Sequence, residues 1–167
     1  IHAYKDGNGR LGRALIPVQM AMLDQSTPIL YMSEILELYK PSYQRNLMEC
    51  RRGNVSGYIK FFLQCIIDQC NAYIYKLDRI KEIYKEDMKT IEAIKGNSVY
   101  KIMSVIMKQI VFTKKEIQEL SGVSPNVVSK IINQLVDLNV IIPDSTKMKK
   151  GYRYQKIYEV FVGTREF

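Results

Sequence analysis

Histidine and cysteine are scarce in this chain, which limits the kinds of site that it can build. The 167 residues contain one histidine, His2, and three cysteines. Cys50, Cys65 and Cys70 show no Cys-x-x-Cys spacing. Without that spacing, and with a single histidine, we expect no zinc site. Three thiols without an evident pairing are typical of a reducing compartment, so we expect a cytoplasmic protein.

Long hydrophobic runs are also lacking. No apolar run approaches the ~20 residues that cross a bilayer, so we expect no membrane span and no membrane partner. A signal peptide is absent, but the first residue is Ile rather than Met, and we expect the chain to be a piece of a longer protein. With 47% hydrophobic and 25% charged residues, the composition is that of an ordinary globular protein with one large or two small domains.

The most informative stretch is His-Ala-Tyr-Lys-Asp-Gly-Asn-Gly-Arg-Leu-Gly-Arg, from His2 to Arg13. Its glycines allow a turn in which backbone amides converge on an anion. A helix is expected from Leu11 to Leu23, so the turn lies at a helix N-terminus, where free N–H groups favour phosphate. Arg10 and Arg13 are i,i+3 neighbours and can reach the same anion. The stretch therefore predicts a nucleotide-phosphate site.

Two other readings of the glycine turn fail on its neighbours. In a calcium loop, Gly9 at position 6 would put Tyr4 at position 1 and Leu15 at position 12, so both of those ligands would be missing. A P-loop would need Lys-Ser or Lys-Thr after the glycines, and neither pair is there. A solvated turn before a surface helix would explain Asp-Gly-Asn-Gly alone, but not a histidine and two arginines at fixed offsets.

The pattern His-x-aromatic-x-acid-Gly-Asn-Gly-Arg-x-x-Arg resembles the active-site signature of the Fic (filamentation induced by cAMP) family, whose members transfer AMP from ATP to protein hydroxyls. The similarity covers roughly the first hundred residues. Ala3 and Tyr4 depart from it, since the family usually has Pro and Phe there. The family also has several helices before the motif, with a flap that docks the target and often an inhibitory glutamate. The chain alone is therefore expected to be weakly active or inactive.

The resemblance implies a protein adenylyltransferase with ATP and Mg²⁺ as cofactors and a target protein that bears a Ser, Thr or Tyr hydroxyl. It implies that His2 is the catalytic base and that Asp6 holds the metal. The implied nucleotide-binding residues are Gly7, Asn8, Gly9, Arg10 and Arg13. Gly9 keeps the AMP-transfer form of the motif, because kinase-like members carry a larger basic residue there. Two alternatives stay open, removal of AMP from a modified protein and a DNA-binding regulator with a vestigial motif.

The fold class expected is mainly α. Apolar periodicity and breakers predict further helices over Ile29–Tyr39, from Ser42 to about Arg51, and from Val55 to about Lys95. The resemblance implies that residues 1–97 are the C-terminal portion of a Fic domain. The pattern changes at Lys95-Gly96-Asn97-Ser98, which marks the predicted domain boundary.

Residues 98–167 predict a winged helix-turn-helix domain with a small β-hairpin. Helices are expected from Val99 to about Phe112, from a Thr113–Glu116 capping box to about Leu120, and from Pro125 onward. A strand over 140–142, a basic loop over 144–151 and a return strand over 152–162 would complete it. The domain resembles the C-terminal domain that many Fic proteins carry.

DNA is a candidate partner of this second domain. From Ser98 onward 11 Lys and Arg stand against 6 Asp and Glu, which gives +5 of the total charge of +8. The candidate DNA-binding residues lie on the third helix and on the wing: Asn126, Ser129, Lys130, Asn133, Lys147, Lys149, Lys150 and Arg153. The helix offers no arginine for bidentate reading of guanine. Homodimerisation or target docking is therefore an equal alternative.

Overall fold

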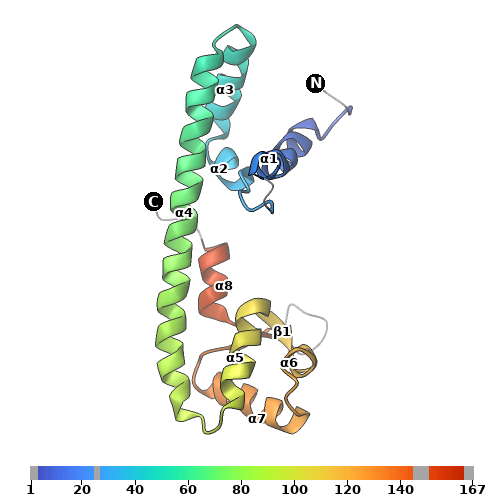
Figure 1. Ribbon diagram of the computed structural model, residues 1–167, viewed down its shortest axis with the longest axis vertical. Helices are drawn as coiled ribbons and strands as arrows, with labels where there is room; N and C mark the ends of the chain where they lie inside the picture. The colour runs from blue at the N-terminus through green and yellow to red at the C-terminus, as the bar shows by residue number, and fades with distance from the viewer. Residues whose placement is uncertain (1–3, 25–26, 145–150, 164–167) are drawn as a thin grey trace. The chain divides into compact units, whose positions relative to one another are not determined.

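The computed structural model describes residues 4–24, 27–144 and 151–163. The chain is mainly helical (Figure 1) and divides into two compact units, Ile1–Tyr75 and Lys76–Phe167. The division lies inside the long helix α4 (Val55–Thr90), because the second half of this helix contributes Ile83 to the C-terminal core. The boundary between a Fic-type domain and a winged helix-turn-helix domain, expected near residue 97, stays a prediction. None of the helices in the described part of the chain is long and apolar enough to cross a membrane.

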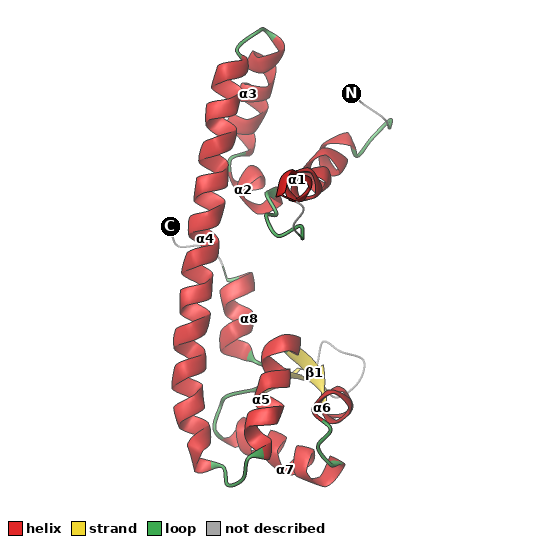
Figure 2. Cartoon of the chain, in the orientation of Figure 1, coloured by secondary structure: helices red, strands yellow, loops and turns green. Residues whose placement is uncertain are grey.

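The first unit consists of α1 (Asn8–Asp24), α2 (Ser33–Leu38), α3 (Lys40–Arg51) and the first half of α4, all coloured red in Figure 2. The predicted helix after the glycine turn is confirmed, with Pro17 inside it. The expected helix over Ile29–Tyr39 is wrong at its start, since α2 begins only at Ser33. The hydroxyl of Tyr73 accepts the N–H of Tyr31 at 3.3 Å and donates to its carbonyl at 3.2 Å. These bonds satisfy the backbone of residue 31 outside a helix.

The start of α3 also differs from the prediction. Ser42 lies inside this helix instead of capping it, and Pro41 occupies its first turn. Proline is favoured there because its missing N–H has no helical partner in any case. The predicted end is confirmed, since Gly53 follows α3 with φ +107°. The core of this unit is formed by apolar residues of α2 and α4 together with the residue before α2: Met32, Ile35, Leu36 and Cys65.

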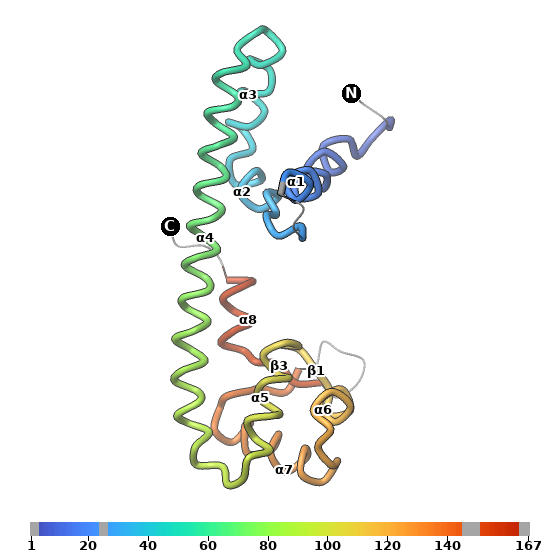
Figure 3. The backbone as a smooth tube through the Cα atoms, viewed as in Figure 1, coloured from blue at the N-terminus to red at the C-terminus, as the bar shows by residue number. Residues whose placement is uncertain are grey.

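The second unit continues from α4 through a short 3₁₀ turn (Ile91–Ala93) into α5 (Ser98–Gln109), β1 (Val111–Thr113), α6 (Lys114–Ser121) and α7 (Pro125–Asp137). Two short strands, β2 (Ile142–Asp144) and β3 (Gly151–Arg153), and the helix α8 (Gln155–Val162) follow. The sheet is antiparallel with the order β1-β3-β2, and its backbone can be followed in Figure 3.

Three predictions for this unit are corrected by the structure. Strand β1 replaces the expected end of the helix that starts at Ser98. Strand β2 begins two residues later than expected. The predicted return strand is extended only over Gly151–Arg153, and the rest of that segment is α8. Ile157 is buried and Val160 partly buried on the core, a spacing of three that suits a helix rather than a strand.

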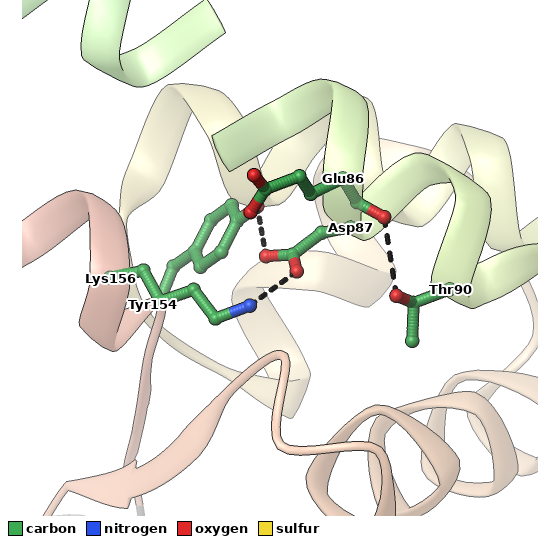
Figure 4. A network of polar contacts seen from close by, with 5 residues as sticks. All are labelled: Glu86, Asp87, Thr90, Tyr154 and Lys156. Carbon is green, nitrogen blue, oxygen red and sulfur yellow. Dashed lines mark hydrogen bonds and ion pairs between the residues drawn. The ribbon is translucent and has the colours of Figure 1, made fainter. Parts of the chain in front are cut away.

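The core of the second unit contains a polar network centred on Asp87. Asp87 on α4 is only 1% exposed. Its carboxylate accepts hydrogen bonds from the hydroxyl of Tyr154 at 2.8 Å and from Nζ of Lys156 at 2.6 Å. Figure 4 shows both donors directed at this carboxylate. The network joins the end of α4 to the start of α8.

The predicted capping box at the start of α6 is confirmed. Thr113 Oγ1 accepts the N–H of Glu116 at 3.3 Å, and the Glu116 carboxylate accepts the N–H of Thr113 at 2.7 Å. Each bond satisfies an amide that the helix leaves without a partner. The box fixes the point where the chain leaves β1 and enters α6.

Thr113→Ala is expected to lower the free energy of unfolding by about 1 kcal/mol, because the cap of α6 is lost. Urea unfolding followed by circular dichroism measures the change. Thr113→Ser keeps the hydroxyl and is expected to stay within about 0.5 kcal/mol of the wild type. An alanine variant as stable as the wild type would show that the capping box does not stabilise the domain.

Candidate functional site

The glycine turn leads directly into α1. Gly7 has φ +82°, a conformation that favours glycine. Its carbonyl accepts the N–H of Leu11 at 2.9 Å, so the helix begins at Asn8, three residues earlier than predicted. The amides of Asn8 and Gly9 therefore belong to the first turn of α1, where N–H groups have no carbonyl partner within the helix. This is the arrangement that can bind an anion through the backbone.

Asn8 and Asp6 shape the turn through hydrogen bonds to its own backbone. The side-chain Oδ1 of Asn8 accepts the N–H of Tyr4 at 2.9 Å, and its Nδ2 donates to the Tyr4 carbonyl at 2.5 Å. The carboxylate of Asp6 accepts the N–H of Gly7 at 2.6 Å. These structural roles were not predicted from the sequence. The predicted contacts of the Asn8 side chain and of the Gly7 amide with phosphate stay predictions.

Arg10 and Arg13 lie on one wall of a pocket of about 370 Å³ between α1 and α2. The other residues that line it are Ala14, Ser33 and Glu37. Arg10 is exposed and Arg13 is half-buried. The structure thus brings together the two arginines that the i,i+3 spacing placed on one side of the helix.

Glu37 is the residue of this pocket that the sequence did not indicate. Nζ of Lys40 donates to its carboxylate at 2.6 Å. This hydrogen bond and the charge of Lys40 lower the pKa of Glu37, and the charge of Arg13 lowers it further. The carboxylate is therefore ionised at neutral pH. Only the Lys40 pairing is visible as an i,i+3 spacing, because Arg13 belongs to a different helix.

Asp6 remains the candidate metal ligand of the turn. Its carboxylate lies 3.8 Å from Arg10, and its side chain is 97% exposed. Among the described residues, no three histidine, cysteine or acidic side chains gather closely enough to hold a metal ion by themselves. The single carboxylate of Asp6 suits Mg²⁺, which proteins commonly bind through one or two carboxylates together with phosphate oxygens and water. The predicted base, His2, lies outside the described residues.

The candidate DNA-binding residues of α7 lie mostly at the surface. Asn126, Lys130 and Asn133 are exposed and Ser129 is half-buried. Val127, which was not predicted, is 38% exposed on the same helix. Asn133 already accepts a hydrogen bond from Nζ of Lys114 on α6 at 3.2 Å.

The predicted wing is only partly covered by the structure. Lys147, Lys149 and Lys150 lie outside the described residues. Arg153 is half-buried in β3, with its guanidinium 4.5 Å from the centre of the Tyr158 ring on α8. This stacking gives Arg153 a packing role beside the predicted one.

A comparison with models of known protein families finds no match, and a comparison with curated proteins finds none either.

Proposed function

We propose that this protein is a protein adenylyltransferase that transfers AMP from ATP to a hydroxyl of a target protein. The observation that carries the proposal is the pocket beside the N-terminus of α1. There the Asp-Gly-Asn-Gly turn starts a helix whose two arginines line the same wall. Backbone amides and a pair of guanidinium groups at one place are suited to a chain of phosphates. A cytoplasmic location, where ATP and reduced thiols coexist, belongs to the same proposal.

In the proposed reaction the target hydroxyl forms a bond to the α-phosphorus while the bond between the α- and β-phosphates breaks and pyrophosphate leaves. His2 takes the proton of the hydroxyl, which makes its oxygen the better nucleophile. The first amides of α1, with Arg10 and Arg13, hold the phosphates in line and offset the charge that develops. Asp6 would hold Mg²⁺, which would neutralise part of the negative charge of the phosphates.

We further propose that residues 98–167, within the second unit, form a winged helix-turn-helix domain and that DNA binding is the candidate function of this domain. The order α5-β1-α6-α7-β2-β3, with β3 between β1 and β2, supports this fold. The observation that favours DNA is that α7 packs one face into the core and leaves Asn126, Val127 and Lys130 exposed. Amide and apolar side chains on such a helix suit A·T base pairs in the major groove.

The first proposal is tested by an incubation with labelled ATP, Mg²⁺ and cell extract. The incubation uses the protein as its gene encodes it. Label bound covalently to protein supports a transferase. Asp6→Ala should weaken the dependence of the transfer on Mg²⁺, because it removes the candidate metal ligand. A total absence of label, together with a gel shift on DNA, would instead favour the regulator.

A further inference from the structure

Each of the two arginines of α1 that line the pocket has a carboxylate in its neighbourhood. Asp6 lies 3.8 Å from Arg10. Glu37 lines the same pocket as Arg13, and the charge of Arg13 acts on it. Glu37 comes from α2, so the second carboxylate reaches the pocket from the opposite wall. Lys40 fixes its position through the 2.6 Å ion pair.

These charges bear on which form of a phosphate ligand the pocket can accept. A metal-free chain of phosphates brings only negative charge, so Glu37 repels it while the arginines attract it. A chain that carries a divalent cation brings both signs of charge and is far less affected by a neighbouring carboxylate. Between exposed groups several ångströms apart, the effect of one unit charge on affinity is modest, and salt reduces it. This is enough to separate the two forms by several-fold.

We infer that Glu37 is a specificity-determining residue, which makes the pocket select a phosphate chain that carries a divalent cation over the metal-free chain. The inference rests on the proposed function, because it assumes that phosphates bind between the two walls. Glu37 acts here through its charge and through Arg13, and it is not assigned to the metal itself. Glu37 on α2 would thus determine ligand specificity together with the residues of the glycine turn and α1.

The chain offers a matched control for this residue. Glu49 on α3 pairs with Arg52 at 2.8 Å with the same i,i+3 spacing, and it does not line the pocket. Glu37→Gln and Glu49→Gln change the net charge equally and keep the side-chain size. Both ion pairs are exposed, so neither substitution is expected to unfold the protein. Circular dichroism checks that both variants are folded.

Calorimetric titration of pyrophosphate, with and without Mg²⁺, into the wild type and both variants tests the inference. We expect Glu37→Gln to bind metal-free pyrophosphate about three- to tenfold more tightly than the wild type, while affinity for the magnesium complex changes less than twofold. Glu49→Gln should resemble the wild type in both titrations.

Three results would overturn the inference alone: an unchanged affinity ratio in Glu37→Gln, a loss of affinity for both forms, or an equal effect of Glu49→Gln. Failure of the wild type to bind pyrophosphate in either form would overturn the proposed function together with the inference.

Discussion

His2→Ala is expected to abolish AMP transfer and to leave nucleotide binding intact. The histidine is the proposed base for the target hydroxyl, and positioned proton transfer contributes typically about 10²–10⁴-fold to a rate. The groups proposed to hold the phosphates belong to α1 and are unchanged in this variant. Transfer of labelled AMP to a fixed amount of target measures the first effect, and calorimetric titration of ATP with Mg²⁺ measures the second.

Arg13→Ala is the control that separates chemistry from binding. Arg13 is half-buried and lines the pocket, so its loss should weaken ATP binding as well as transfer. The two variants are thus expected to differ in affinity although both transfer poorly. Full turnover by His2→Ala would contradict the proposed role of His2 as the catalytic base. A loss of ATP affinity in His2→Ala would show that the histidine serves binding.

Elements with local start and stop signals were predictable from the sequence. The Thr113–Glu116 capping box and Pro125 at the first turn of α7 lie within one helical turn of the boundaries that they set. Gly53, in the left-handed region, ends α3 as expected. Because such signals act between residues close in the sequence, they can be read without knowledge of the fold.

Elements that depend on distant partners were missed. The backbone of Tyr31 is held by Tyr73, so no local pattern reveals why α2 starts late. The return strand was predicted over 152–162, where Tyr152, Tyr154 and Tyr158 have the even spacing of residues on one face of a strand. Instead Tyr154 is buried against Asp87, which lies on another helix, and the chain turns into α8 at this point. Tertiary contacts therefore decided both elements, as they commonly do when propensity is weak.

The candidate site likewise combines residues that were predictable from local sequence with one that depends on a distant partner. Asp6, Arg10 and Arg13 lie within one short stretch, and the i,i+3 rule placed the arginines together before the structure did. Glu37 enters the pocket from α2, and its relation to Arg13 exists only after the two helices pack. The roles assigned to His2 and to the wing lysines stay predictions.

A large contribution to the stability of the second unit is expected from Asp87. Its carboxylate is buried and accepts hydrogen bonds from two groups, Nζ of the half-exposed Lys156 and the hydroxyl of the fully buried Tyr154. Burial, followed by the hydrogen bond to Asp87 and its negative charge, raises the pKa of Tyr154 far above its ordinary value. The tyrosine therefore stays a neutral donor. This buried acceptor is costly to remove, because the hydroxyl of Tyr154 would lose its bond in a place that water does not reach.

Asp87→Ala is expected to lower the free energy of unfolding by about 3 kcal/mol. The hydroxyl of Tyr154 would be left buried and unsatisfied, at about 1–3 kcal/mol, and Lys156 would lose its charge partner. Asp78→Ala is the matched control, since Asp78 lies on the same helix in an exposed ion pair with Lys81 at 3.1 Å. That pair should contribute less than about 1 kcal/mol. Urea unfolding of both variants compares them directly. If Asp87→Ala cost no more than Asp78→Ala, the network would be shown not to stabilise the junction of α4 and α8.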